Sequence, residues 1–216
     1  MDGFEVAAVI PAFNEEKSIA MVVESLLPYA KVIVVNDLSS DSTAKYALAA
    51  GADVVNHKVN QGYDGALNSG FLRAKELGFK KVFTFDADGQ HPVEQVTEFI
   101  KKLDSYDVVL GVRPKAARFA EGVFARFGAV LWGINDPLCG FKAYNMKVYD
   151  MNGGFDSCNS IGTELAIQSF RRGFSLINIP IPISEREFGK PRFGKLFKAN
   201  SVIFKAMLKM IFTKKV

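Results

Sequence analysis

The sequence has few of the residues from which disulfide frameworks and cysteine–histidine metal sites are built. Its 216 residues include two cysteines, two histidines and one tryptophan. Cys139 and Cys158 form neither a disulfide framework nor a metal-ligand spacing, so we expect free thiols in a reducing cytoplasm. Of the histidines, we expect His57 in a loop and His91, which precedes Pro92, in the cap region of a helix.

Long hydrophobic runs are also missing. No uninterrupted apolar run reaches the ~18 residues that a membrane-spanning helix requires. The opening segment MDGFEV carries an acid where a signal peptide carries basic residues. Hydrophobic residues nevertheless make up 49% of the chain, which excludes a disordered protein. We therefore expect a single cytoplasmic domain with a sizeable core.

Acidic residues are nearly absent from the last part of the chain. Residues 186–216 contain nine basic residues and one acidic residue, a net charge of +8, whereas the whole chain has +4. The first 185 residues therefore have a net charge of −4. This asymmetry predicts that residues 186–216 meet an anionic partner.

The basic segment also has the spacing of an amphipathic helix over residues 195–216. Apolar residues recur every three or four positions, and lysines form the opposite stripe at Lys198, Lys205 and Lys209. This profile is typical of a helix that lies on an anionic membrane, and docking against the domain is the alternative. No aromatic RNA-binding motif accompanies the basic residues, so a nucleic-acid partner is not expected.

Short apolar runs alternate with segments of helical spacing through the first half of the chain. We expect strands at residues 5–10, 31–35, 52–56, 82–85 and 107–111, with helices between them. This alternation predicts an α/β fold with a mostly parallel sheet flanked by helices. The second half predicts an amphipathic helix (113–133), a strand (141–145), a helix (160–172) and an extended edge segment (176–187).

Polar stretches follow three of the expected strands and therefore meet at one edge of the sheet. One of them, DADGQ, places Asp86 and Asp88 on the same side of an extended chain, where their repulsion favours a bound cation. Another, PAFNEE, contains no glycine, which argues against a dinucleotide-binding fingerprint and against a nucleotidyltransferase loop.

Six motifs in order resemble the family-2 glycosyltransferases of the A-type fold, in particular the dolichyl-phosphate mannose synthase-like group. They are PAFNEE, VVNDLSSDST, NQGYDGALNSG, DADGQHP, DPLCGFKAY and PIPISEREFGKPR. The resemblance runs from residue 8 to about residue 195. Any one of these motifs is weak evidence, but six in the family's order are strong. The resemblance implies a nucleotide-sugar-binding half (1–112), an acceptor half (113–194) and the basic helix (195–216).

The resemblance also implies roles for individual residues. Mg²⁺ or Mn²⁺ would be bound by Asp88 and Gln90, with Asp86 and Ala87 against the nucleotide. The base and ribose would be enclosed by Pro11, Phe13, Glu15, Val35 and Asp37. The phosphates would contact Arg113, Arg186 and Arg192. Because Asn36 replaces the family's usual first aspartate, a GDP-linked and a UDP-linked sugar both remain open.

The function implied is inverting transfer of a sugar to a polyprenyl- or dolichyl-phosphate acceptor, on the cytoplasmic membrane face. The catalytic residues would be Asp88, Arg113 and Asp136, with Asp136 or Glu164 as a base if the acceptor is a hydroxyl. Two alternatives remain open: the same donor chemistry with a saccharide or other hydroxyl acceptor, and a non-catalytic nucleotide-sugar-binding module.

Overall fold

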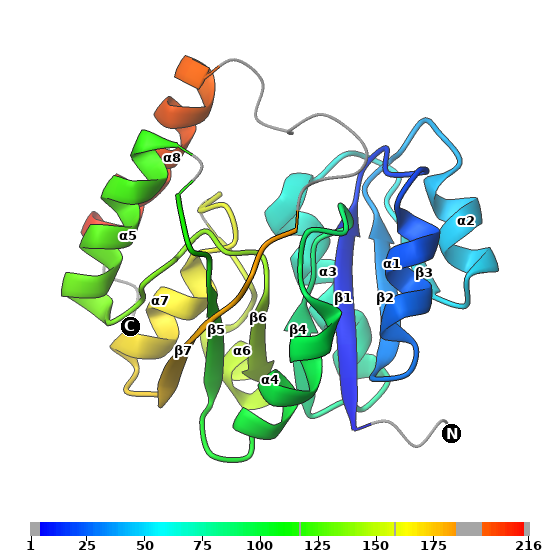
Figure 1. Ribbon diagram of the computed structural model, residues 1–216, viewed down its shortest axis with the longest axis horizontal. Helices are drawn as coiled ribbons and strands as arrows, with labels where there is room; N and C mark the ends of the chain where they lie inside the picture. Colours follow the sequence, from blue (N-terminus) through cyan, green and yellow to red (C-terminus); the bar gives the residue numbers. More distant parts are fainter. Residues whose placement is uncertain (1–4, 117, 158, 185–195, 214–216) are drawn as a thin grey trace.

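The protein folds around a seven-stranded sheet flanked by helices (Figure 1). The computed structural model describes residues 5–116, 118–157, 159–184 and 196–213. The sheet has the order β3-β2-β1-β4-β6-β5-β7. Its strands are β1 (Val6–Ala12), β2 (Lys31–Asn36), β3 (Asp53–Asn56), β4 (Lys81–Thr84), β5 (Val108–Val112), β6 (Lys142–Asn145) and β7 (Leu176–Pro180).

The pairing of the strands confirms the expected, mostly parallel sheet. Strands β1 to β4 pair in parallel, and so do β5 and β7. Strand β6 runs antiparallel to both β4 and β5. The predicted strand at 141–145 and the predicted edge segment beginning at residue 176 correspond to β6 and β7.

Most helices lie where helical spacing predicts them. They are α1 (Ile19–Leu26), α2 (Thr43–Ala49), α3 (Gly62–Glu76), the 3₁₀ helix η1 (Val93–Gln95), α4 (Val96–Lys102), α5 (Phe119–Trp132), α6 (Met146–Asn152), α7 (Glu164–Arg171) and α8 (Leu196–Phe212). Helix α6 was not predicted. It follows β6 without a loop and has no side-chain cap, so no local signal separates it from the strand.

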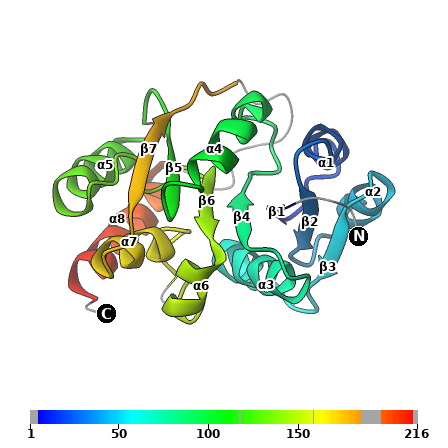
Figure 2. The ribbon, with the colours of Figure 1, turned by 90° about the horizontal axis from the view of Figure 1, so that it is seen from below.

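Two apolar layers cover the two faces of the sheet. One contains residues of α3, α5, α6, α7 and α8, and the other contains residues of α1, α2 and α4. Figure 2 shows α3, α6 and α7 on one side of the strands and α1 and α4 on the other. Alternate residues of β1 enter the two layers, as strand geometry requires, so the strands are apolar on both faces.

Helix α8 packs on the domain beside α5 (Figure 1). Its buried side chains are Ala199, Ile203, Ala206, Met207 and Met210. Polar contacts fix both ends: the Asn200 amide oxygen accepts a hydrogen bond from the Ala120 N–H, and the Arg171 guanidinium donates to the carbonyls of Met210 and Thr213. Within the described residues, no helix has the length and apolar character needed to cross a membrane.

Candidate functional site

The loops that follow β1 and β2 form one connected rim at the carboxyl edge of the sheet. The Asn14 N–H donates to Ser39 Oγ at 2.9 Å, and the Ser40 N–H donates to Asn14 Oδ1 at 2.8 Å. The Glu15 N–H donates to Thr43 Oγ1 at 2.8 Å. These bonds connect PAFNEE to NDLSSDST, as expected for loops that leave neighbouring parallel strands.

The residues predicted to enclose a nucleotide differ in whether their side chains are exposed to a ligand. Pro11, Val35 and Ala87 are buried, so only their backbone groups can face a ligand. Phe13 is 40% exposed and offers a ring face on which a planar base could stack. Glu15 is partly buried on the same rim. The β1 loop thus supplies an aromatic surface and a carboxylate side by side.

Asp37 does not lie open to a ligand. It is 4% exposed, and its carboxylate accepts the Gln61 N–H at 2.7 Å and the Gly62 N–H at 2.8 Å. His57 Nδ1 lies 2.7 Å from the same carboxylate. Because the N-terminus of a helix attracts anions, Asp37 stabilises the start of α3. In this structure the Asp37 carboxylate accepts hydrogen bonds at the start of α3, and its contact with a nucleotide stays a prediction.

His57 lies in the loop after β3, as expected, and its buried side chain bridges two elements. Its Nδ1 faces Asp37, and its Nε2 lies 2.9 Å from Ser69 Oγ on α3. A carboxylate can only accept, so the arrangement assigns the donor proton to Nδ1. Nothing in the local spacing around His57 indicates this role, since both partners are distant in sequence.

Asp86 is held by two side chains that are not among the predicted site residues. His91 Nε2 lies 2.9 Å from Asp86 Oδ2, and the Tyr63 hydroxyl donates to Oδ1 at 3.2 Å. The carboxylate also presses against Gly140, where an added Cβ would lie 2.1 Å from Oδ2. Tyr63, His91 and Gly140 fall within three of the six motifs, and this membership is the signal in the sequence that could have indicated them.

A buried lysine lies behind these carboxylates. Lys142 is 3% exposed, and its ammonium donates to the carbonyls of Pro137 and Gly162, each at 2.7 Å. Burial lowers the pKa of Lys142, and the charges of Asp136 and Asp86 partly oppose that shift. The Lys142 side chain therefore joins the backbone at Pro137 to that at Gly162 without reaching solvent.

The Asp88–Gln90 turn has the donors that a hard divalent cation prefers. Asp88 Oδ1 accepts the Gln90 N–H at 3.1 Å across Gly89, whose φ is 72°. The Gln90 amide NH₂ donates to the Ser184 carbonyl at 3.2 Å, which leaves the amide oxygen as the ligand atom. No group of three acidic, histidine or cysteine side chains suited to a metal occurs in the described part of the chain. The turn fits a cation that takes few protein oxygens and completes its shell with phosphate and water.

The two acids proposed as bases are both engaged. Asp136 accepts two bonds from the Arg113 guanidinium, at 2.7 Å and 2.9 Å, and Arg113 lies 3.4 Å from Glu121. Burial opposes the charge of Arg113, but its hydrogen bonds to Asp136 keep its pKa raised. Glu164 is fully buried and accepts the backbone N–H and hydroxyl of Ser157. Either carboxylate would have to give up these hydrogen bonds before it could act as a base.

One further acid outside the predicted set holds a strained loop. The Asp64 carboxylate accepts the N–H groups of Ile161 and Gly162, and both residues have positive φ. Burial, with a contribution from the Asp156 charge, raises the pKa of Asp64 to about 6. Left-handed backbone at a β-branched residue is rare and marks functional loops. Arg186 and Arg192, the remaining predicted phosphate contacts, lie outside the described residues.

Comparison with known proteins places this site in a family. Residues 7–125 match the model of glycosyl transferase family 2. The chain is 28% identical to a dolichyl-phosphate hexose transferase of Haloferax volcanii, over 95% of this chain and 93% of that protein. It is 25% identical to an undecaprenyl-phosphate mannosyltransferase of Micrococcus luteus, over 88% of this chain and 87% of that protein.

A solved structure identifies the fold. The chain superposes on glucosyl-3-phosphoglycerate synthase of Mycobacterium tuberculosis, crystallised with Mg²⁺ and uridine diphosphate, with a TM-score of 0.76. The match covers 96% of this chain and 79% of that one at 20% identity, so it concerns the fold alone. The chain has the A-type glycosyltransferase fold and belongs to glycosyl transferase family 2, in its dolichyl-phosphate mannose synthase-like group.

Proposed function

We propose that the protein transfers a sugar from a nucleotide-diphosphate sugar, GDP- or UDP-linked, to a polyprenyl- or dolichyl-phosphate acceptor on the cytoplasmic membrane face. The observation that carries the proposal is the coverage of the named relatives. They match the acceptor half as well as the donor half, and both are named for lipid-phosphate acceptors. Transfer would invert the anomeric carbon, because the acceptor oxygen attacks it directly.

The donor half accounts for departure of the nucleotide. Asp88 and the Gln90 amide oxygen would hold Mg²⁺ or Mn²⁺, which would neutralise charge on the departing diphosphate. Asp86 is fixed by His91 and Tyr63 at the same strand end, where it can orient the nucleotide. Phe13 would stack on the base from the β1 loop. Asp86 and the Asp88–Gln90 turn are held by hydrogen bonds before the ligand arrives, which lowers the cost of positioning them.

The acceptor half fits an anionic nucleophile better than a hydroxyl. A hydroxyl needs a carboxylate to remove its proton, whereas a phosphate oxygen already carries charge. Asp136 is paired with Arg113, and Glu164 is buried against Ser157. Arg113 would attract the acceptor phosphate at the end of β5, with Asp136 fixing the guanidinium plane.

The test is an assay of purified protein with GDP- and UDP-sugars and Mg²⁺ or Mn²⁺, against two acceptor classes. We expect glycosyl transfer to a short-chain polyprenyl phosphate and release of the nucleoside diphosphate. Transfer to free saccharides alone would replace the acceptor by the hydroxyl alternative. Tight donor binding without transfer to any acceptor would instead support a binding module.

Gly140→Ala tests the close contact behind Asp86. A methyl group at this position cannot coexist with the carboxylate where it stands, because its carbon would lie 2.1 Å from Oδ2. Asp86 must move away from His91 and Tyr63, and we expect turnover to fall by about tenfold or more. Gly122→Ala is the matched control, since the nearest atom to its added Cβ lies at 3.8 Å. Equal turnover in both variants would show that transfer does not depend on the position of Asp86.

A further inference from the structure

Lys142 lies at the edge of the sheet where the site is formed, because β6 runs antiparallel to its neighbours. It is the first residue of β6 and pairs with Thr84, the last residue of β4. The last residue of β6, Asn145, pairs with Lys81, where β4 begins. The antiparallel pairing therefore places Lys142 close to Asp86, which follows β4, and Asn145 at the opposite edge.

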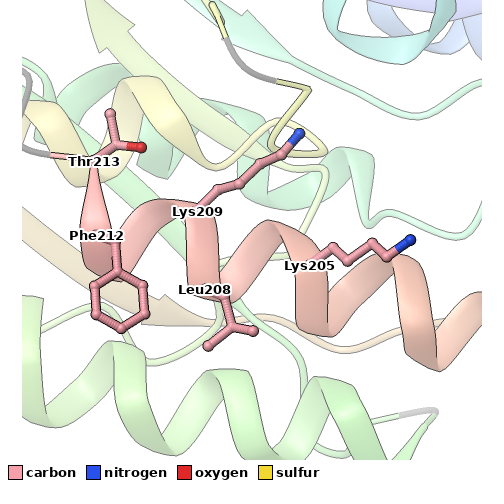
Figure 3. A pocket seen from close by; sticks show the side chains of 5 residues that line it. All are labelled: Lys205, Leu208, Lys209, Phe212 and Thr213. Carbon is pink, nitrogen blue, oxygen red and sulfur yellow. The ribbon is translucent and has the colours of Figure 1, made fainter.

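The side chain of Lys142 differs from those of the surface lysines. Lys205 and Lys209 are exposed on α8 beside a surface pocket (Figure 3), whereas Lys142 is 3% exposed. Its amine donates to the carbonyls of Pro137 and Gly162, each at 2.7 Å. Removing an amine from water is unfavourable unless its donors are paired, so these two bonds hold the side chain in place. They also join two loops that are distant in sequence.

The first of the two carbonyls belongs to the predicted acceptor side of the site. Pro137 follows Asp136, whose carboxylate accepts two bonds from the Arg113 guanidinium. The same carboxylate accepts the Arg113 N–H at 3.2 Å, so the ion pair is also fixed to the backbone at the end of β5. A shift of the Pro137 carbonyl would therefore move Asp136 and the guanidinium together.

The second carbonyl belongs to a loop that supports the donor side. Gly162 has a φ of 70°, and its N–H donates to the Asp64 carboxylate of α3. The ring of Tyr63, the preceding residue of α3, lies against this glycine, because a Cβ added to Gly162 would be 2.8 Å from Tyr63 Cε1. The Tyr63 hydroxyl donates to Asp86 Oδ1 at 3.2 Å. Lys142 therefore holds the backbone against which the partner of Asp86 packs.

We propose that Lys142 is a positioning residue that fixes the donor carboxylate Asp86 relative to the acceptor pair of Arg113 and Asp136. The inference rests on the proposed function, because that function assigns these groups to the two substrates. Lys142 acts through one backbone carbonyl on each side and touches neither substrate. Transfer requires the acceptor oxygen to meet the anomeric carbon closely, and a misplacement of about 1 Å can slow a reaction by about a hundredfold.

Asn145 provides the comparison with a purely structural role. Its amide NH₂ group donates to the carbonyls of Leu103 and Tyr106, each at 3.1 Å, on the same strand but at the edge away from the site. Lys142→Met and Asn145→Leu each leave two carbonyls without their side-chain donor. Both variants should therefore lose stability. Only Lys142→Met should also change nucleotide binding and transfer.

The test compares three measurements on these variants: the melting temperature, the dissociation constants of GDP and UDP with Mn²⁺, and kcat and KM for a short-chain polyprenyl phosphate. We expect Lys142→Met to weaken nucleotide binding by about tenfold and to lower kcat/KM by about a hundredfold, because both halves of the site lose their common support. Lys142→Arg keeps donors for both carbonyls and should recover part of each loss. Asn145→Leu should keep wild-type binding and transfer at a temperature where it is folded.

A pair of glycine variants tests the donor side independently of Lys142→Met. Gly162→Ala places a methyl group against Tyr63. Gly153→Ala places one at nearly the same backbone conformation, with a φ of 74°, where the added Cβ meets no atom within 4 Å beyond its chain neighbours. Both variants carry the strain of a left-handed alanine and should lose similar stability. Only Gly162→Ala should weaken nucleotide binding, by about tenfold, because Tyr63 must move.

Two results would overturn the positioning role. One is wild-type binding and transfer by a folded Lys142→Met or, where that variant does not fold, by Gly162→Ala. The other is an equal loss of binding and transfer in Lys142→Met and Asn145→Leu. Wild-type transfer that none of the variants alters would reject the positioning role alone. Nucleotide binding that Lys142→Met and Gly162→Ala weaken, without transfer to any acceptor, would reject the proposed function alone, and a wild type that binds no nucleotide would contradict both.

Discussion

Replacing Asp88 by asparagine is expected to abolish most glycosyl transfer while leaving the fold intact. The variant replaces the only anionic ligand that we assign to the divalent cation by a neutral amide. Without the cation, charge on the departing diphosphate is not neutralised, and we expect turnover to fall by about a hundredfold or more. The asparagine side-chain oxygen can still accept the Gln90 N–H, so the turn should persist.

The measurement is steady-state turnover as a function of Mn²⁺ concentration, with the melting temperature of each variant recorded alongside. Glu98→Gln makes the same chemical change on the exposed face of α4 and should match the wild type. A residual activity of Asp88→Asn that rises only at high Mn²⁺ would support the ligand role. Wild-type turnover of Asp88→Asn in excess chelator would contradict it.

Much of the fold was predictable because its signals are local. Strands β1 to β4 are short β-branched or apolar runs, and each is followed by a polar stretch at the same edge of the sheet. Helix α6 was missed because it begins directly at the end of β6. The position of α8 could not be fixed from its own residues, since its apolar stripe suits a domain surface and a bilayer equally. The contacts that hold α8 on the domain come from α5 and α7, which are distant from it in sequence.

The site was predictable in its motifs but not in its hydrogen bonds. Asp86, Asp88 and Gln90 lie at the carboxyl edge, as their position after β4 predicts. The partners of Asp86, by contrast, come from α3 and from the residues that follow the turn, and sequence spacing does not show that they converge. The pairing of Asp136 with Arg113 was likewise hidden, because 22 residues separate two groups that the fold brings within 2.7 Å. Two residues of opposite charge to which the sequence gives separate roles, such as Arg113 and Asp136, can therefore form an ion pair with each other in the folded chain.

Asp37→Ala is expected to lower the free energy of unfolding by ~3 kcal/mol or more, because it leaves several donors without an acceptor. The carboxylate now receives the N–H groups of Gln61 and Gly62 and the proton of His57 Nδ1. Asp37 and His57 are buried and Gly62 is partly buried, and an alanine methyl cannot accept any of these hydrogen bonds. The N-terminus of α3 would also lose the anion that its dipole favours.

Urea denaturation gives the stability change, and calorimetric titration with GDP- and UDP-sugars gives the donor dissociation constant, both at a temperature where the variant stays folded. Asp150→Ala is the control: it breaks the exposed ion pair with Lys75 and should cost about 1 kcal/mol or less. If Asp37 acts by holding the start of α3, the main effect of Asp37→Ala should be a lower free energy of unfolding. Any loss of donor affinity should then follow from disorder at Gln61 and Gly62. The stability of Asp37→Asn should then lie between those of the wild type and Asp37→Ala. Its amide keeps one accepting oxygen, but its NH₂ group would face an N–H that the second carboxylate oxygen now accepts. Wild-type stability of Asp37→Ala together with weakened donor binding would show the opposite, that the carboxylate's main contact is with the nucleotide.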